Sequence, residues 1–443
     1  MGIKSYVKNL IEEFPDIASK KKPYNIEILC IDLNELLHKS CYISFNNEEF
    51  KNNLINKINK LVNKIRPKEL SIFTDGQAIL AKARTQMIRR NKYLYSTPES
   101  VSPLNLTPGT PFMDFVDSIV EEYLSGLKIK TYYSSSRENN EGELKLFNWL
   151  LINGLKNRVC IFGSDADLIV LALASRPLLD LYVYNKDVYI SLFKLVDNIS
   201  KIASLKNFSY QTNPVRLDFV LLSMFMGNDY NNKISKFEYI IKAYKIIQKE
   251  NKSFLVKKDG SINLALLKKL FVKLEKPSLI IDDKISSYNY INALQWNLNL
   301  YQGIINNRYI PNYGRVNIST ILKYFPSKIV LPENKVDWLK PEVYTLLLMP
   351  VIGKELLPDK LKILLDTDSP VKDLFPEPCL DCINYKKELN IKPPNDDENS
   401  QAYKEFKDFI RKINEEYSNH LEEYHNFEEL PIKRLEDAVK NIK

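Results

Sequence analysis

The sequence predicts an α/β fold with a mostly parallel central sheet flanked by helices, followed by a helical second region. Over residues 1–230 short β-rich runs alternate with helical stretches, and this order indicates a parallel sheet covered on both faces. From about residue 231 helical periodicity dominates. We therefore divide the 443 residues into an α/β core over 1–230, a mainly helical region over 231–390 that packs on the core, a polar linker over 391–400 and a C-terminal helical segment over 401–443.

The individual elements follow from local patterns. Strands are expected in five runs rich in branched and aromatic residues, at 26–32, 69–75, 128–133, 159–165 and 179–185. Helices are expected over about 48–65, from about 78, after Thr110 and from 141. Thr110 as N-cap followed by Pro111 is typical of a helix start. In the tail, apolar residues recur at helical spacing, so this helix should pack back on the body: Tyr403, Phe406, Ile410, Ile413 and Tyr417.

The composition indicates a soluble, intracellular protein. Hydrophobic residues make up 44% of the chain and the net charge is +8, which suits a polyanionic partner. No apolar run reaches the ~18 residues of a membrane span, and charged residues interrupt the first thirty positions, unlike a secretory signal. Two of the five cysteines, Cys30 and Cys160, lie inside strand-like runs. We therefore expect a reducing compartment and a cytoplasmic location, or a viral factory or virion if the source is viral.

Carboxylates follow several of the predicted strands. Three runs end in the same way, "ILCID" at Asp32, "SIFTD" at Asp75 and "IFGSD" at Asp165. The carboxyl ends of parallel strands form one edge of a sheet, where open α/β folds bind ligands. Four further acids should join them: Glu141, Glu143, Asp167 and Asp229, the last of which should end a strongly apolar helix. Oxygen-only ligands suit two Mg²⁺ or Mn²⁺ ions that act on a phosphodiester. Each acid could instead be a helix N-cap. Capping alone does not explain why three predicted strands all end in an aspartate.

A basic helix follows Asp75. In "GQAILAKARTQMIRRNKY" no acid occurs, and helical spacing brings four polar residues to one face: Lys82, Gln86, Arg89 and Arg90. Guanidinium forks and an ammonium charge suit a phosphate group. The alternative is a solvated, charged helix face.

These motifs, taken in order, resemble the XRN-type 5′→3′ exoribonuclease family over nearly the whole chain. The resemblance rests on "IDLNELLH" (31–38), "DGQAILAKARTQMIRR" (75–90), "LTPGTPFM" (106–113), "GSDADLIVLAL" (163–173) and "MGNDY" (226–230), and "LQWNLNLYQG" (294–303) is similar to its second conserved region. It implies a PIN/5′-nuclease-like core and a compact member without extra C-terminal modules. The Lys, Asn and Ile bias suggests a large DNA virus or a protist as the source.

The resemblance also implies roles for single residues. All seven acids would be catalytic ligands of two metal ions, and the four residues of the basic helix would bind a 5′-monophosphate. His38 would stack on the first base. Tyr309 would be the second stacking aromatic, with Tyr313 as the alternative because "INNRYIPNYG" departs from the family pattern.

The implied activity is metal-dependent, stepwise 5′→3′ degradation of 5′-monophosphorylated, single-stranded RNA to nucleoside 5′-monophosphates. The resemblance also implies a monomer that acts in mRNA decay after a decapping enzyme.

Three alternatives remain. A flap-type nuclease acting on DNA should carry a Gly-rich helix-hairpin-helix after Asp229, yet Gly260 is the only glycine between Asp229 and Gly303. A catalytically silent RNA-binding scaffold would tolerate lost acids, and none is lost. A zinc module is the third alternative, made of Cys379, Cys382, His420 and His425. The 37 residues between Cys382 and His420 exceed the usual ~12 to 15, and two histidines so spaced on one helix should point apart, so packed thiols compete with this interpretation.

Overall fold

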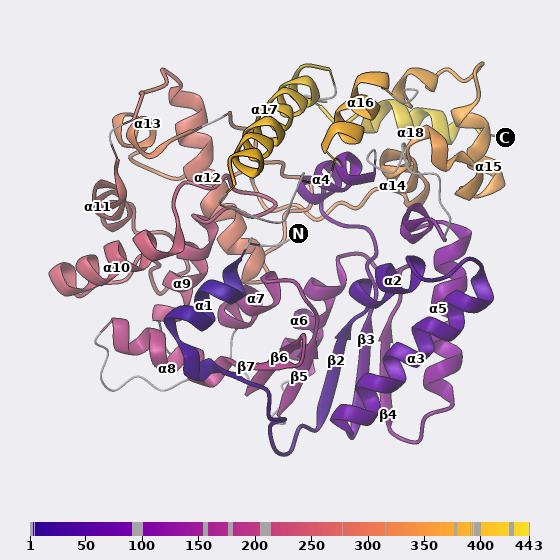
Figure 1. Cartoon of the computed structure of the whole chain (residues 1–443), viewed down its shortest axis with the longest axis horizontal. Helices are drawn as coiled ribbons and strands as arrows, with labels where there is room; N and C mark the ends of the chain where they lie inside the picture. The colour runs from indigo at the N-terminus through magenta and orange to yellow at the C-terminus, as the bar shows by residue number, and fades with distance from the viewer. Residues whose placement is uncertain are drawn as a thin grey trace.

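A seven-stranded sheet forms the centre of the computed structural model (Figure 1). The structure describes residues 3, 5–90, 101–153, 158–175, 180–203, 214–276, 278–314, 316–375, 379–389, 391, 393, 400–424 and 429–442. The strands lie in the order β1-β7-β6-β5-β2-β3-β4. Their bounds are β1 Ala18–Ser19, β2 Ile28–Asp32, β3 Glu69–Phe73, β4 Lys130–Ser134, β5 Val159–Phe162, β6 Leu181–Asn185 and β7 Val188–Ser191.

The sheet is mostly parallel, as the sequence predicts. Strands β6, β5, β2, β3 and β4 run in the same direction. Strand β7 runs antiparallel to its two neighbours, β6 and the edge strand β1. The parallel direction brings the carboxyl ends of β2, β3 and β5 to a common edge, because parallel neighbours end together. The expected α/β architecture is therefore confirmed.

Helices surround the sheet and form the second half of the chain. In the first half they are α1 Tyr6–Glu13, α2 Asn34–Cys41, α3 Asn47–Ile65, α4 Leu80–Arg90, α5 Pro111–Ser125, α6 Gly142–Asn153, α7 Asp167–Ala174, α8 Leu192–Ile202 and α9 Val215–Met224. The later ones are α10 Phe237–Asn251, α11 Leu264–Leu274, α12 Lys284–Tyr301, α13 Ile318–Lys323, α14 Pro341–Leu348, α15 Asp359–Lys362, α16 Leu380–Leu389, α17 Gln401–Tyr424 and α18 Ile432–Lys440. Among the described residues, none of these helices combines the length and apolarity that crossing a membrane requires.

Two apolar cores lie on opposite faces of the sheet. Along β2 the side chains alternate, with Ile28 and Cys30 in one core and Leu29 and Ile31 in the other, as the two-residue period of a strand requires. Helices α3 and α5 cover one face, while α1, α6 and α7 cover the other (Figure 1). Strands buried on both faces explain the continuous apolar runs in the sequence.

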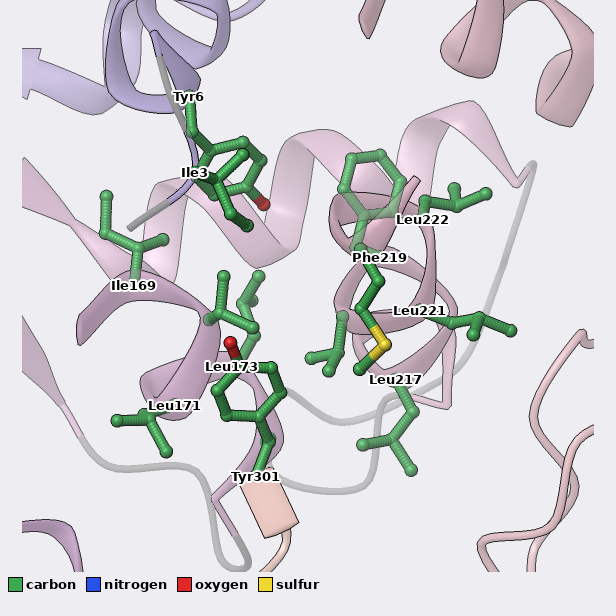
Figure 2. Packing of buried hydrophobic residues seen from close by; sticks show 14 of the residues in the cluster. Ile3, Tyr6, Ile169, Leu171, Leu173, Leu217, Phe219, Leu221, Leu222 and Tyr301 are labelled. Carbon is green, nitrogen blue, oxygen red and sulfur yellow. The ribbon is translucent and has the colours of Figure 1, made fainter. Parts of the chain in front are cut away.

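Helix α7 is enclosed on all sides. Every residue from Asp167 to Ala174 is buried, and Figure 2 shows Ile169, Leu171 and Leu173 of α7 in the same apolar cluster as the buried Tyr301. Side chains in such a close-packed core have little freedom to shift. The first residue of α7, Asp167, is therefore held in a fixed position.

The second half of the chain contributes a further core around α4. Ala78, Leu80 and Met87 pack with Val343 and Leu347 of α14, and α14 also packs against α18 (Figure 1). The apolar side of α4 is thus covered by residues more than two hundred positions later in the chain. Helix α4 lies between the sheet and the second region.

One expected helix end differs from the structure, and the expected linker lies mostly outside the described residues. The helix predicted to end at Asp229 ends at Met224, because Gly227 adopts a φ of +83° and turns the chain. Of the expected linker at 391–400, only residues 391, 393 and 400 belong to the described part. In the tail, Ile413 is buried and Tyr417 packs against Tyr385 of α16.

Candidate active site

Asp32 and Asp75 lie side by side at the carboxyl ends of β2 and β3. Asp32 is the last residue of β2 and is 8% exposed. Asn34 connects the two acids, since its N–H donates to Asp32 Oδ1 at 3.4 Å and its Oδ1 accepts the Asp75 N–H at 3.4 Å. The first turn of α2 is thereby fixed to the strand ends.

Gly142 brings the start of α6 against both carboxylates. Its N–H donates to Asp75 Oδ1 at 2.5 Å. A Cβ at this position would lie 3.2 Å from Asp32 Oδ1 and 3.1 Å from the Phe73 carbonyl oxygen, so a side chain would crowd the site. The approach carries the neighbouring Glu141 and Glu143 toward the same edge of the sheet.

Asp165 and Asp167 follow β5. Asp165 Oδ1 accepts the Asp167 N–H at 3.1 Å, so Asp165 makes a cap-type bond at the start of α7, as the N-cap interpretation expects of an Asp. Asp167 is 1% exposed. Its position inside the core is not explained by capping, because the hydrogen bond uses its backbone rather than its carboxylate.

Lys82 joins the remaining acid to the cluster. Asp229 follows the turn after α9, and the Lys82 ammonium contacts Asp229 Oδ2 at 2.7 Å and Glu141 Oε1 at 3.1 Å. Arg89 contacts Asp229 Oδ1 at 2.6 Å. The Lys82 side chain is 6% exposed, so this ion pair is largely removed from water.

The pKa values show how strongly the acids repel one another. Burial and the charge of Asp75 raise the pKa of Asp32 well above its usual range, and burial and Asp165 do the same for the pKa of Glu143. Burial and Asp165 raise the pKa of Asp167 to about 8. At Asp229 burial is outweighed by Lys82 and Arg89, and its pKa is lowered.

The structure therefore brings all seven predicted acids into one interacting cluster. Glu141 completes it: burial raises its pKa, Lys82 opposes this, and Asp75 and Asp229 add to the rise. Lys82 and Arg89 neutralise part of this negative charge. Like charges at such distances cost several kcal/mol per pair at an effective dielectric near ~20.

The cluster fits divalent cations. All seven side chains offer oxygen, the donor that Mg²⁺ and Mn²⁺ prefer. Glu141 Oε2 and Asp167 Oδ1 are buried acceptors with no hydrogen-bond donor among the described residues. Buried oxygens without a donor are costly, and a bound cation would satisfy them.

The four residues of the predicted phosphate pocket divide into two pairs along α4. Lys82 and Arg89 face the acids. Arg90 instead donates from Nε to Thr107 Oγ1 at 2.9 Å, and its Nη1 lies 3.4 Å from Gln86 Oε1. Gln86 Oε1 also accepts from the Tyr344 hydroxyl at 3.0 Å. The pocket role of all four residues stays a prediction.

The two predicted stacking residues border opposite ends of α4. His38 is exposed on α2, and its pKa is lowered by loss of solvent and by the charge of Arg90, with Asp75 acting in the opposite sense. The loop of Tyr309 meets the start of α4, where the Leu80 N–H donates to the Asn307 carbonyl at 3.0 Å. Tyr309 is half-buried and packs on the buried Trp296, with ring centroids 5.2 Å apart.

Tyr313, the alternative, has a structural position. Its hydroxyl donates to the Tyr230 carbonyl at 2.8 Å and accepts the Asn232 N–H at 3.1 Å. These bonds hold the chain just after Asp229. Because its hydroxyl is engaged in this way, Tyr313 is less suited than Tyr309 to stack on a base. The stacking role itself stays a prediction.

Two contributing residues were missed by sequence reasoning. Asn34 follows the end of β2 by two positions, so its place beside Asp32 gave a usable signal. Tyr344 gave none, because it lies in an ordinary apolar helix segment and reaches Gln86 only through the tertiary fold.

The sequence comparisons agree with this geometry. A family model described as the XRN 5′-3′ exonuclease N-terminus matches residues 1–103 and 95–179, a span that holds six of the seven acids and all of α4. The N-terminal region of this chain is similar to that family. Asp229 and the whole second region lie beyond the match.

Curated relatives are named as 5′-3′ exoribonucleases. The 5′-3′ exoribonuclease 1 of Schizosaccharomyces pombe is 24% identical over 344 residues, which cover 62% of this chain and 26% of the relative. The protein of the same name from Saccharomyces cerevisiae is 24% identical over 327 residues, covering 59% and 21%. The matched part thus spans about a quarter of these XRN relatives.

Solved structures show weaker likeness. The catalytic core of Rad2 in complex with DNA is 16% identical, with a TM-score of 0.38 over 66% of this chain and 84% of that one. The T5 D15 protein co-crystallised with metal ions is 14% identical, with a TM-score of 0.34 over 62% and 89%. The similarity to the XRN family therefore rests on the sequence matches.

Proposed function

We propose that the chain is a metal-dependent 5′→3′ exoribonuclease that degrades 5′-monophosphorylated RNA stepwise to nucleoside 5′-monophosphates. One observation carries the proposal. Seven carboxylates meet at the carboxyl edge of the sheet, and the basic helix α4 lies directly beside them. The XRN-type match over residues 1–179 and the exoribonuclease names of the relatives support the direction of cleavage and the choice of RNA.

The acids supply the chemistry of the site. Two bound divalent cations, Mg²⁺ or Mn²⁺, would polarise the scissile phosphodiester and activate a water molecule. Asp32, Asp75 and Asp165 hold them at the strand ends, with Asp167, Glu141, Glu143 and Asp229 completing the set. Lys82 neutralises part of the negative charge of Glu141 and Asp229. It therefore reduces the repulsion between the carboxylates when fewer cations are bound.

The end of α4 selects the 5′ terminus. Arg90 is half-exposed and held by Thr107 and Gln86, so its guanidinium is oriented before RNA arrives. The charge of Arg90 also acts on His38, which brings a phosphate-binding group close to a ring that can stack on the first base. One oriented guanidinium beside one ring suits a single phosphate, and capped or triphosphorylated ends should be poor substrates.

Stacking explains stepwise movement. An aromatic ring binds any base with ~1 to 3 kcal/mol, so His38 and Tyr309 would hold the strand after each cut without selecting a sequence. Monophosphorylated RNA is the product of decapping, so we place the enzyme in cytoplasmic mRNA decay, downstream of a decapping enzyme and acting as a monomer.

The direct test uses RNAs that differ only at the 5′ end. Purified protein with Mg²⁺ should release mononucleotides from 5′-monophosphate RNA and act poorly on 5′-hydroxyl, triphosphate and capped RNA. Matched single-stranded and flap DNA complete the series. Preferred cleavage of flap DNA would overturn the proposal in favour of a structure-specific DNA nuclease, and no cleavage of any substrate would favour a silent scaffold.

Asp165→Ala tests the metal site. Losing one ligand misplaces a catalytic ion, so nucleotide release should fall by at least ~100-fold while circular dichroism and the melting temperature stay close to the parent. Asp408→Ala, an exposed acid on α17, is the matched control and should cleave normally. Parent-like cleavage by the Asp165 variant would remove this residue from the site.

A further inference from the structure

Three soft ligand groups meet between α16 and α17, outside the carboxylate cluster. Cys379 directly precedes α16, Cys382 lies in its first turn and His420 lies near the end of α17. One ligand atom from each side chain lies within 4.8 Å of the others. Cys379 Sγ and His420 Nε2 are 3.2 Å apart.

This spacing matches a metal site. Zn²⁺ binds sulfur at ~2.3 Å and imidazole nitrogen at ~2.0 to 2.1 Å, so the ligand atoms of a tetrahedral site lie roughly 3.6 to 3.8 Å apart. The distance of 3.2 Å between Cys379 Sγ and His420 Nε2, with all three ligand atoms within 4.8 Å, requires only small side-chain shifts to reach this geometry. Cys379 and Cys382 are three residues apart at a helix start, which brings both thiols to one side.

The surroundings hold the imidazole in place. The His420 ring packs on Tyr385 with centroids 5.8 Å apart, and Tyr385 in turn packs on Tyr417 at 5.6 Å. Cys382 is 3% exposed. Helices α16 and α17 lie side by side (Figure 1), so a metal ion here would join them.

We propose that Cys379, Cys382 and His420 bind one Zn²⁺ ion that fastens α17 to α16. Thiolate and imidazole ligands select zinc over the magnesium class that suits the carboxylates. Three protein ligands leave one position of a tetrahedral site for water or a fourth residue. His425, which the sequence groups with these three, lies outside the described residues. The inference is independent of the proposed nuclease function.

Metal content tests the proposal directly. Full-length protein purified without added metal should contain close to one zinc per chain by plasma mass spectrometry. The double variant Cys379→Ser with Cys382→Ser should lose it. His420→Ala should weaken zinc binding in a competition titration by more than the ~10- to 100-fold that losing an outer partner costs. Cys41→Ala and Asp167→Asn, which alter a thiol elsewhere and the carboxylate cluster, should keep full zinc content.

Cobalt substitution of the parent protein gives a second measurement that does not depend on variants folding. Co²⁺ bound by two thiolates should show tetrahedral visible bands together with a sulfur-to-metal charge-transfer band. The proposal is overturned if the parent protein carries no zinc and shows no such bands. It is equally overturned if peptide mapping finds a Cys379–Cys382 disulfide as the stable form, or if the double serine variant retains parental zinc.

Discussion

Lys82 is a buried ammonium between two buried carboxylates. Sequence reasoning assigned it to the phosphate, because a lysine in a basic helix suits an anion. In the structure it contacts Glu141 and Asp229, and its pKa is raised well above the usual range because these neighbours outweigh the effect of burial. Its partners come from α6 and from the turn after α9, and no local pattern could have paired them.

Removing the Lys82 charge should destabilise the metal-free protein. Lys82→Met keeps much of the side-chain volume but removes the cation from the buried Glu141 and leaves Asp229 with Arg89. Breaking such a buried pair costs about 3 to 5 kcal/mol. Urea unfolding in the presence of a chelator measures the loss, and saturating Mg²⁺ should reduce it. Lys51→Met, which removes an exposed pair with Glu122, is the control. Equal effects of the two variants would contradict a special role of the buried pair.

At the scale of the element, the strand ends were the most predictable part of the site. Each of β2, β3 and β5 is followed closely by an acid, and the parallel register follows from the alternation of strands and helices. Helix α4 was predictable as a helix with one basic face. The sequence did not predict that Lys82 and Arg89 face the acids while Arg90 and Gln86 bond to each other. The partners that hold Arg90 and Gln86, Thr107 and Tyr344, come from other parts of the chain.

Helix α4 provides a prediction about end selection. Arg90→Ala should reduce the preference for 5′-monophosphate over 5′-hydroxyl RNA by roughly 10-fold or more, because a charge-assisted contact is worth ~1.5 to 3 kcal/mol. The rate on 5′-hydroxyl RNA should change little. Arg84→Ala on the same helix is the control. If initial rates show an unchanged preference, the end of α4 does not bind the phosphate.

The segment after α12 provides a prediction about processivity. With Tyr309→Ala, partly degraded intermediates of long RNA should accumulate, because the strand loses a stacking surface. Tyr309→Trp should keep the degradation processive. Gel analysis of end-labelled RNA under single-hit conditions distinguishes the two. Tyr313→Phe loses the hydroxyl bonds to Tyr230 and Asn232 and should lower the melting temperature without intermediates. The reverse pattern would exchange the roles of the two tyrosines.

For the whole molecule, the acid cluster couples stability to pH. The pKa of Asp167 is about 8 in the fold against an ordinary value of 3.8, so the native state holds this proton more tightly than the unfolded chain. That contribution to stability is complete below about pH 4 and is lost as the pH rises toward 8. The raised pKa values of Asp32 and Glu143 act in the same direction.

Without divalent metal, the melting temperature should therefore fall by several degrees between pH 5 and pH 8. Asp167→Asn cannot lose the proton, and its melting temperature should fall less over this range. Scanning calorimetry in a chelating buffer gives both curves, with Asp408→Asn as the exposed control. Parallel curves for the parent and the Asp167 variant would show that this carboxyl does not govern the slope.

Contacts between residues far apart in the sequence were the part of the structure that the sequence could not predict. The order of strands and helices indicates the sheet, and the acids at its edge indicate the site. The cluster of Cys379, Cys382 and His420 depends on two helices packing across a long sequence gap. The spacing alone argued against a zinc site, because it could not show that α17 returns to the start of α16.

The seating of α4 against α14 has a consequence for synthesis on the ribosome. Gln86 and its partner Tyr344 are 258 residues apart, and contacts of such separation form late. When the first half of the chain has left the ribosome, its sheet can assemble. Val343 and Leu347, which cover the apolar side of α4, have not yet been synthesised. The proposed phosphate-binding end is thus incomplete until α14 has been synthesised. If the proposed function holds, the nascent chain should stay inactive toward nearby RNA until that point.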